Sequence, residues 1–261
     1  MDVSRRSLYL VFWIVTTFCS THAADLQIVA HRGANHLAPE NTMAAAQKCV
    51  ELGVDYVEID VRMSKDGVFY ILHDRTLDRT TDGTGAIKDR SSAYVDTLDA
   101  GSWFGAEFKG EKVPRLEAFL NELNGKIKIY FDVKDADLRR LLDLVYETGF
   151  EKDCFFWFSR DSRAEEFRKL DKTIWLKMNA RNERDLERVM AYRPQIIECG
   201  LEQLTPAFVG FCKEHDLKLM ALVLGKGSEV SYPEIINSPA DMVNLDKADL
   251  MMRLISRSVG R

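Results

Sequence analysis

The stretch from Val57 to Asp74, VEIDVRMSKDGVFYILHD, places two carboxylates inside an apolar, β-branched run and ends in a histidine followed by an aspartate. Alternate residues of a strand point to the same face, so Glu58 and Asp60 share one side and the apolar residues beside them share the other. Burying two carboxylates together is costly unless a cation compensates their charge. The pattern therefore indicates that this strand holds a positively charged species.

Two further apolar runs end in polar residues of the same kind. The run QIVA is followed by His31 and Arg32. In the run KIKIYFDVK, Asp132 and Lys134 lie two residues apart and so face the same side. Carboxylates from neighbouring strands form an oxygen-rich site that suits a hard divalent cation, Mg²⁺ or Ca²⁺. We therefore expect a metal site, although an ion-pair network is the structural alternative for any single pair.

The charges of these side chains indicate a phosphodiester ligand. Three carboxylates and a divalent cation, together with Arg32 and Lys134, leave a formal charge of +1. A phosphodiester carries a single negative charge, so it binds without accumulating charge, and a guanidinium group suits its oxygens. His31 and His73 add two groups that can exchange protons near neutral pH.

Strand-like and helix-like patterns alternate along the chain, and eight strand–helix units follow residue 24. The predicted strands cover residues 27–33, 56–63, 126–134, 154–159, 173–180, 196–200, 217–224 and 241–246. Eight units predict an α/β fold, the (β/α)8 TIM barrel, in which active sites lie at the carboxyl ends of the strands. A doubly wound open sheet is the alternative. The first helix is predicted over residues 39–53, with Pro39 near its start and Gly53 just past its end.

An insertion is predicted after the second strand. The sequence SKDG predicts a hairpin turn that leads into a short strand, VFYILHD. Residues 75–114 that follow are too many for an ordinary loop and include three aromatic side chains in its second half. We expect a small ordered insertion that shapes a pocket beside the barrel mouth.

Residues 1–23 have the pattern of a secretory signal peptide. Two arginines precede an apolar run from Leu8 to Phe18, and small residues lead to Ala23. The run is shorter than the roughly 20 apolar residues that span a bilayer. We therefore expect cleavage, a mature chain over residues 24–261 with no stable membrane span, and export to the periplasm or the cell exterior.

The composition of the mature chain argues against a nucleic-acid partner. Removing residues 1–23 leaves 34 basic and 40 acidic residues, a net charge of −6. Four cysteines remain, and they are widely spaced: Cys49, Cys154, Cys199 and Cys212. They show no metal-ligand spacing, and the sequence leaves open whether they form disulfides or stay as buried thiols.

The motifs HRG, PENT, EIDV, SKDG, HD and RTT occur in this order between Ile28 and Lys134. In these motifs the chain resembles the glycerophosphodiester phosphodiesterase family, and LDAGSWFG and VPRLEAFL resemble that family's insertion and the helix after it. The resemblance implies a barrel and metal-dependent hydrolysis of glycerophosphodiesters to glycerol 3-phosphate and an alcohol. It also suggests attack by the substrate's own glycerol 2-hydroxyl through a cyclic phosphate.

The resemblance implies a role for each candidate residue. His31 and His73 would be the acid–base pair, Glu58, Asp60 and Asp132 the metal ligands, and Arg32 and Lys134 the phosphate contacts. Which histidine is the acid and which the base stays open. Glu40 is shared with the motif, and we expect it to support the start of a helix.

The chain differs from the family pattern at two positions. The third metal ligand is usually a glutamate, whereas FDVK places Asp132 there, and Leu222 stands near the place of a substrate-lining tryptophan. The first difference shortens one side chain that would bind the metal, and the second changes the pocket for the leaving alcohol.

Two other functions stay open at this point. One is a phospholipase D-like or lyase-type relative that acts on choline phospholipids, and the other is a non-catalytic phosphodiester-binding protein. His31 and His73 argue against a purely binding role, because binding needs neither. The insertion with RTTDGTG favours the glycerophosphodiesterase. Headgroup preference and oligomeric state are not readable from the sequence.

Overall fold

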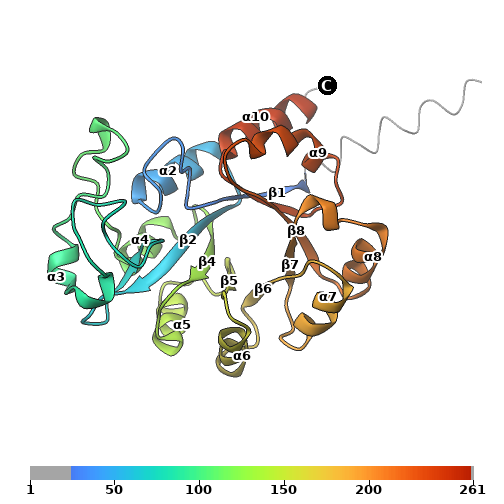
Figure 1. Cartoon of the computed structure of the whole chain (residues 1–261), viewed down its shortest axis with the longest axis horizontal. Helices are drawn as coiled ribbons and strands as arrows, with labels where there is room; N and C mark the ends of the chain where they lie inside the picture. Colours follow the sequence, from blue (N-terminus) through green and yellow to red (C-terminus); the bar gives the residue numbers. More distant parts are fainter. Residues whose placement is uncertain (1–24, 260–261) are drawn as a thin grey trace, which may run out of the picture.

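Eight parallel strands close into a barrel in residues 25–259, the part of the chain that this computed structural model describes (Figure 1). The predicted signal peptide lies outside these residues. The barrel strands are β1 (Gln27–Ala30), β2 (Tyr56–Met63), β4 (Lys128–Val133), β5 (Cys154–Trp157), β6 (Trp175–Asn179), β7 (Ile196–Cys199), β8 (Lys218–Val223) and β9 (Met242–Leu245). Each pairs with its neighbours in that order, and β1 pairs with both β9 and β2. This closure confirms the predicted (β/α)8 barrel over the open sheet.

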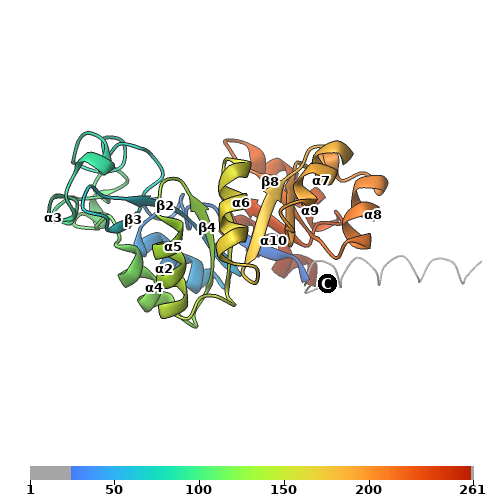
Figure 2. The ribbon, with the colours of Figure 1, turned by 90° about the horizontal axis from the view of Figure 1, so that it is seen from below.

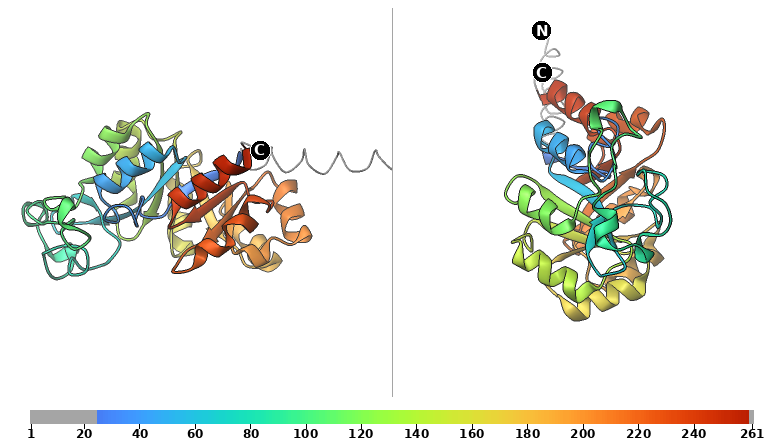
Figure 3. Two further views of the ribbon diagram at one scale, coloured as in Figure 1. Left: turned by 90° about the horizontal axis from the view of Figure 1, so that it is seen from above. Right: turned by 90° about the vertical axis from the view of Figure 1, so that its left-hand side faces the viewer.

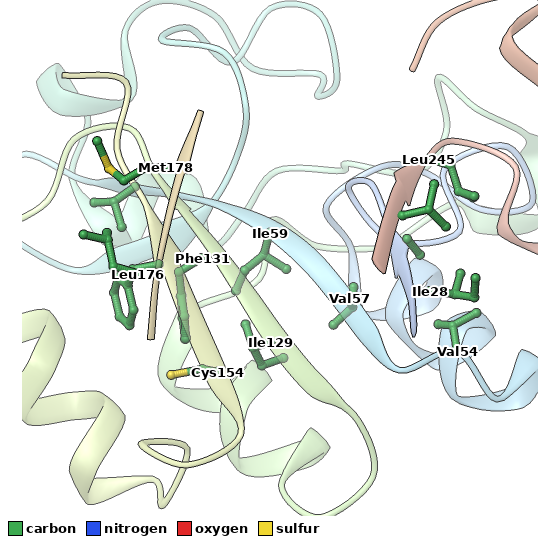
Figure 4. Packing of buried hydrophobic residues seen from close by; sticks show 14 of the residues in the cluster. Ile28, Val54, Val57, Ile59, Ile129, Phe131, Cys154, Leu176, Met178 and Leu245 are labelled. Carbon is green, nitrogen blue, oxygen red and sulfur yellow. The ribbon is translucent and has the colours of Figure 1, made fainter. Parts of the chain in front are cut away.

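Helices cover the outside of the barrel (Figures 1 and 2). One follows each barrel strand or its hairpin: α2 (Met43–Leu52), α4 (Leu116–Leu123), α5 (Leu138–Glu147), α6 (Asp161–Leu170), α7 (Glu183–Met190), α8 (Pro206–Glu214), α9 (Tyr232–Ile236) and α10 (Ala248–Val259). The outward side chains of the strands, among them Val57, Ile59, Ile129 and Phe131, form the large apolar core under these helices (Figure 4). Within residues 25–259, no helix combines the length and the apolar character needed to cross a bilayer.

The first helix begins later than the sequence predicts. It was expected from Pro39, but α2 starts at Met43, because Asn41 has a φ of 58° and cannot continue a right-handed helix. Thr42 caps the helix by accepting a hydrogen bond from the first turn. Gly53 ends it in the left-handed conformation at a φ of 71°, as its position predicts.

The segment between β3 (Phe69–Ile71) and α4 projects from one side of the barrel (Figures 2 and 3). Strand β3 pairs antiparallel with β2, as the hairpin prediction requires. The segment contains the short helix α3 (Ser92–Val95) and has its own apolar cluster, which includes Leu77, Ile87 and Val95. The separate core explains how a long connection between two barrel elements stays ordered.

The four cysteines within residues 25–259 are buried and free. Burial raises the pKa of the Cys49 thiol to about 12 and that of Cys199 to about 12. The thiols therefore stay protonated near neutral pH and pack as small apolar groups.

The inside of the barrel has an apolar floor and a polar upper layer. The floor is made of Val29, Tyr56, Tyr130, Phe155, Ile196, Met220 and Met242. Above it, the Lys177 ammonium forms an ion pair with Glu198 in the barrel interior and lies 4.6 Å from the Trp157 ring centroid. Asn179 donates a second hydrogen bond to Glu198 at 2.9 Å. Both side chains are almost fully buried, so each charged group is stabilised by the opposite charge of the other.

Replacing Lys177 with methionine is expected to lower the free energy of unfolding by about 3–5 kcal/mol, because it leaves the Glu198 carboxylate buried without its cation. Chemical denaturation with far-UV circular dichroism measures the loss. The double variant Lys177→Met/Glu198→Gln should recover part of it, because no unpaired charge remains. A double variant as unstable as the sum of the two single variants would show that the pair is not the cause.

Candidate active site

The polar residues predicted from the sequence meet at the carboxyl ends of neighbouring strands. Strands β9, β1, β2 and β4 are adjacent in that order. His31 directly follows β1, Glu58 and Asp60 lie on β2, and Asp132 lies on β4. The register aligns Asp60 with Asp132 across the β2–β4 pair. Because parallel strands all end at one rim, residues far apart in sequence come together there.

Glu58, Asp60 and Asp132 form a compact group, here called the carboxylate cluster. One oxygen of each lies within 4.8 Å of the others, and all three residues are buried. Glu58 Oε2 accepts a hydrogen bond from the backbone N–H of Arg32 at 2.6 Å, and Asp60 Oδ2 accepts one from the Asn41 side chain at 2.6 Å. Asp132 Oδ1 is buried, and no group in the described part of the chain forms a hydrogen bond with it. This unpartnered oxygen and the all-oxygen donor set fit a hard divalent cation.

The electrostatics of the carboxylate cluster also favour a cation. Burial, and then the charges of Asp60 and Asp132, raise the pKa of Glu58 well above its usual range. Burial and the charge of Asp60 raise the pKa of Asp132 to about 6. Burial also opposes the ionisation of Asp60, but nearby positive charges, led by Lys134, outweigh it and lower its pKa. A cation among the three would relieve the repulsion that raises the first two values.

Lys134 follows β4 and lies at the edge of the carboxylate cluster. Its ammonium is paired with Asp132 and lies 3.0 Å from Asp60 Oδ1. Burial opposes its charge, but these two carboxylates outweigh burial and raise the pKa of Lys134. The side chain therefore stays protonated at the place where the sequence predicts a phosphate contact.

Arg32 belongs to a chain of ion pairs that reaches the insertion. Its φ of 55° is unusual for a residue with a side chain and aims its backbone N–H at the carboxylate cluster. Its Nη1 donates to Glu40 Oε1 at 2.9 Å. Arg79 donates to both oxygens of Glu40, at 2.7 and 2.8 Å, and also to Asp74. Glu40, predicted to support a helix start, instead precedes the helix and orients Arg32.

Each of the two predicted catalytic histidines has a carboxylate at its Nδ1. His31 Nδ1 lies 2.7 Å from Asp246 Oδ1, and His73 Nδ1 lies 2.7 Å from Asp74 Oδ1. A carboxylate at Nδ1 favours the tautomer with its proton there and leaves Nε2 free for proton exchange. Burial lowers the pKa of His73, even though Asp60 and Asp74 favour its charged form. Its ring is therefore neutral near pH 7 and able to accept a proton.

Asp246 and Arg79 are functional candidates that the sequence analysis did not identify. Asp246 directly follows β9, just as His31 follows β1, so a polar residue at the end of an apolar strand was the available signal. Besides His31, it accepts hydrogen bonds from Asn35 Nδ2 and from the backbone N–H of Gly225, each at 2.8 Å. These contacts hold the carboxylate in one orientation against the imidazole ring. Arg79 had a different signal, since it is the first residue of the RTT motif, which supported the family resemblance but was given no role in the site.

Replacing Asp246 with asparagine is expected to lower kcat on the order of 10²-fold with little change in KM, because the His31 tautomer is no longer enforced. Steady-state kinetics and the pH profile of kcat measure the effect. Asp249→Asn is the matched control, since Asp249 also contacts a histidine, His36, at 2.9 Å. A kcat for Asp246→Asn equal to that of Asp249→Asn would remove Asp246 from the positioning of His31.

Comparison with known proteins finds one family. The profile of the glycerophosphoryl diester phosphodiesterase family matches residues 31–159, which include every site residue predicted from the sequence. A glycerophosphodiester phosphodiesterase of Bacillus subtilis is 38% identical over 145 residues. That alignment covers 50% of this chain and 50% of the relative, so the chain matches half the length of that protein.

Solved structures extend the match over the whole barrel. The crystal structure of a glycerophosphodiester phosphodiesterase from Agrobacterium tumefaciens has a TM-score of 0.81 and 36% identity, and the match covers 87% of this chain and 99% of that one. A phosphodiesterase from Oleispira antarctica, solved with its product sn-glycerol 3-phosphate, has a TM-score of 0.80 and 25% identity, covering 90% and 99%. The chain belongs to the glycerophosphodiester phosphodiesterase family, whose members are phosphoric diester hydrolases.

Proposed function

We propose that the protein is an exported, metal-dependent enzyme that hydrolyses glycerophosphodiesters to glycerol 3-phosphate and an alcohol. The main observation in support of this proposal is the buried carboxylate cluster at the barrel rim. His31 and His73 lie at the same rim, and each has a carboxylate at its Nδ1. Phosphodiester hydrolysis needs charge stabilisation at phosphorus and two proton transfers, and this arrangement offers groups for both. The product bound to the Oleispira antarctica relative supports glycerol 3-phosphate as the product here.

The positive groups at the rim bind the phosphodiester. Glu58, Asp60 and Asp132 would hold a divalent cation, which would supply Lewis-acid stabilisation of the phosphate charge. Arg32, which Glu40 orients, binds the non-bridging phosphate oxygens through its remaining N–H groups. Lys134 adds a second positive charge beside Asp132. Together these groups hold the phosphate and offset the negative charge that develops on it.

His31 and His73 carry out the two proton transfers. One Nε2 takes the proton of the attacking hydroxyl, and the other Nε2 gives a proton to the departing alcohol oxygen. The attacking hydroxyl in this proposal is the glycerol 2-hydroxyl, which is already held beside phosphorus and gains the advantage of proximity. A cyclic phosphate forms as the alcohol leaves, and water then opens it to glycerol 3-phosphate.

The 2-deoxy analogue of a glycerophosphodiester, an ester of 1,3-propanediol with the same leaving alcohol, is expected to inhibit competitively but to turn over orders of magnitude more slowly. It keeps the charge and the leaving group and lacks only the hydroxyl that attacks. The assay follows alcohol release from both substrates, with chelated enzyme as the blank. Equal turnover would assign the attack to water and reject the cyclic phosphate.

A panel of substrates tests the reaction itself. Release of glycerol 3-phosphate from glycerophosphocholine, glycerophosphoethanolamine or glycerophosphoglycerol is expected, and its absence from all three would contradict the proposal. Lysophosphatidylcholine and sphingomyelin are included as substrates to test the alternative activity on choline phospholipids. Hydrolysis of these two alone would replace the proposed substrate class with that one.

We propose export because of the sequence of residues 1–23. Protein purified from the periplasm or the culture medium of its source should begin near Ala24 on N-terminal sequencing. Protein found only in the cytoplasm with an intact Met1 would contradict export and leave the proposed reaction untouched.

A further inference from the structure

A cavity of about 330 Å³ with positively charged walls lies beside the candidate active site. Its charged lining residues come from three strand ends and from the insertion, and we call it the basic hollow: Arg62, Arg75, Lys88, Lys134, Arg160 and a single acid, Asp135. Arg62 lies on β2, Lys134 follows β4 and Arg160 follows β5. The barrel rim and the insertion therefore build its walls together.

Among the described residues, four of the five positive side chains of the basic hollow form no ion pair, whereas the fifth, Lys134, is paired with Asp132 and Asp60. Among residues 25–259, none of Arg62, Arg75, Lys88 and Arg160 forms an ion pair with a carboxylate. Two other arginines of the insertion and its edge do form ion pairs, Arg79 with Glu40 and Arg115 with Asp96.

The Arg62 guanidinium is held in a fixed position in the wall of the basic hollow. Its Nε and Nη2 donate to the backbone carbonyl of His73 at 2.9 and 2.6 Å, so the guanidinium is fixed in place. A cavity lined by five cationic side chains and one carboxylate is suited to an anion.

The basic hollow is continuous with the site of the proposed reaction. Lys134 lines it and also lies 3.0 Å from Asp60 Oδ1 in the carboxylate cluster. Arg62 lines it and holds the main chain at His73, a proposed acid–base residue. A substrate whose scissile phosphate lies at the carboxylate cluster can therefore extend its leaving alcohol into the basic hollow.

We propose that the basic hollow binds a second phosphate on the alcohol portion of the substrate. This inference rests on the proposed function and adds a substrate preference: glycerophosphodiesters whose alcohol carries a further phosphate are hydrolysed in preference to those with a neutral alcohol. The cavity volume suits a small polar group. The second phosphate is either a terminal monoester of a small molecule or a diester within a longer chain of such units.

Matched substrates test the preference on the metal-loaded enzyme. The first is the glycerol 3-phosphate ester of 1,4-butanediol, and the second carries a phosphate on the distal hydroxyl of the butanediol. Release of glycerol 3-phosphate is followed for both. We expect kcat/KM to be about tenfold higher for the phosphorylated substrate, the effect of one ordinary charge-assisted hydrogen bond, with most of the difference in KM. Equal values would overturn the inference while leaving the proposed function intact, whereas no release from either substrate would contradict the proposed function.

Variants of the insertion assign the preference to the basic hollow. The double variant Arg75→Gln/Lys88→Gln should reduce the preference to less than about threefold, with the loss confined to the phosphorylated substrate. The control is Lys152→Gln/Arg184→Gln, which removes the same charge from exposed positions away from the hollow. Equal losses in the two variants would assign the preference to long-range attraction and overturn the inference.

A third substrate identifies the source of the second phosphate. It carries a methyl ester on the distal phosphate, which converts the terminal monoester into a diester of single negative charge. A preference that disappears on methylation supports a small phosphomonoester as the natural group. A preference that persists supports a chain of phosphodiesters. Either result is consistent with the basic hollow as the binding site, provided that the Arg75→Gln/Lys88→Gln variant removes the preference.

Discussion

Replacing either His31 or His73 with alanine is expected to lower kcat by about 10²- to 10⁴-fold, the usual contribution of a positioned acid or base. KM should change little, because the groups proposed to bind the phosphate, Arg32 and Lys134, are unchanged in these variants. The reason lies in the two Nδ1 contacts of 2.7 Å, which leave one Nε2 on each ring for the reaction. Steady-state kinetics on a glycerophosphodiester measure both constants.

The control for this prediction is His36→Ala. His36 lies in the loop after β1, close in sequence to His31, but its Nε2 lies 2.9 Å from Asp249 Oδ1, so its carboxylate contact is at Nε2 and not at Nδ1. We expect its kcat to stay within about threefold of the unmodified enzyme, an effect well below that of an acid or base. The variant lacking both His31 and His73 should be little worse than the weaker single variant, because the two act in one sequence of proton transfers. Near-normal turnover of either single variant would exclude that histidine from the reaction.

Removing divalent cations is expected to abolish hydrolysis, and adding Mg²⁺ or Ca²⁺ back should restore it. The carboxylate cluster explains the dependence, since burial and mutual repulsion raise the pKa of Glu58 and of Asp132 when no cation is present. Binding should also stabilise the fold: a cation at 100 times its Kd adds about 2.7 kcal/mol, which raises the unfolding temperature by roughly 5–10 °C for a domain of this size. Thermal unfolding with and without cation measures this shift independently of activity.

Two variants test the cation prediction. Asp60→Asn should lose both the activity and the thermal shift, because it removes a ligand charge. Asp132→Glu should keep both if the shorter side chain is a family variant, and should lose both if the site is built around aspartate at this position. Full activity after exhaustive chelation, with no thermal shift on adding either cation, would exclude the carboxylate cluster as a metal site.

The sequence by itself determined the elements and the chemistry carried by short segments. The alternation of apolar and acidic residues in Tyr56–Met63 is a local property of a strand, and the structure places Val57 and Ile59 in the outer core as that alternation requires. The eight strand–helix units predicted the barrel, because a parallel strand must be followed by a crossover helix. Local conformation was less predictable: the left-handed backbone of Asn41 delays α2, and no pattern in the sequence signals it.

Only the tertiary structure decided which distant residues meet. Asp246 lies 215 positions after His31, and the two meet because β9 pairs with β1 when the barrel closes. The Lys177–Glu198 pair likewise depends on the register between β6 and β7. In the sequence, each residue is a single charged residue in a predicted strand, and nothing there indicates that the two are partners. The basic hollow depends on where the insertion packs against the rim. Such contacts follow from strand register, closure and packing between distant segments, which are set by the whole core, so no local pattern of residues reports them.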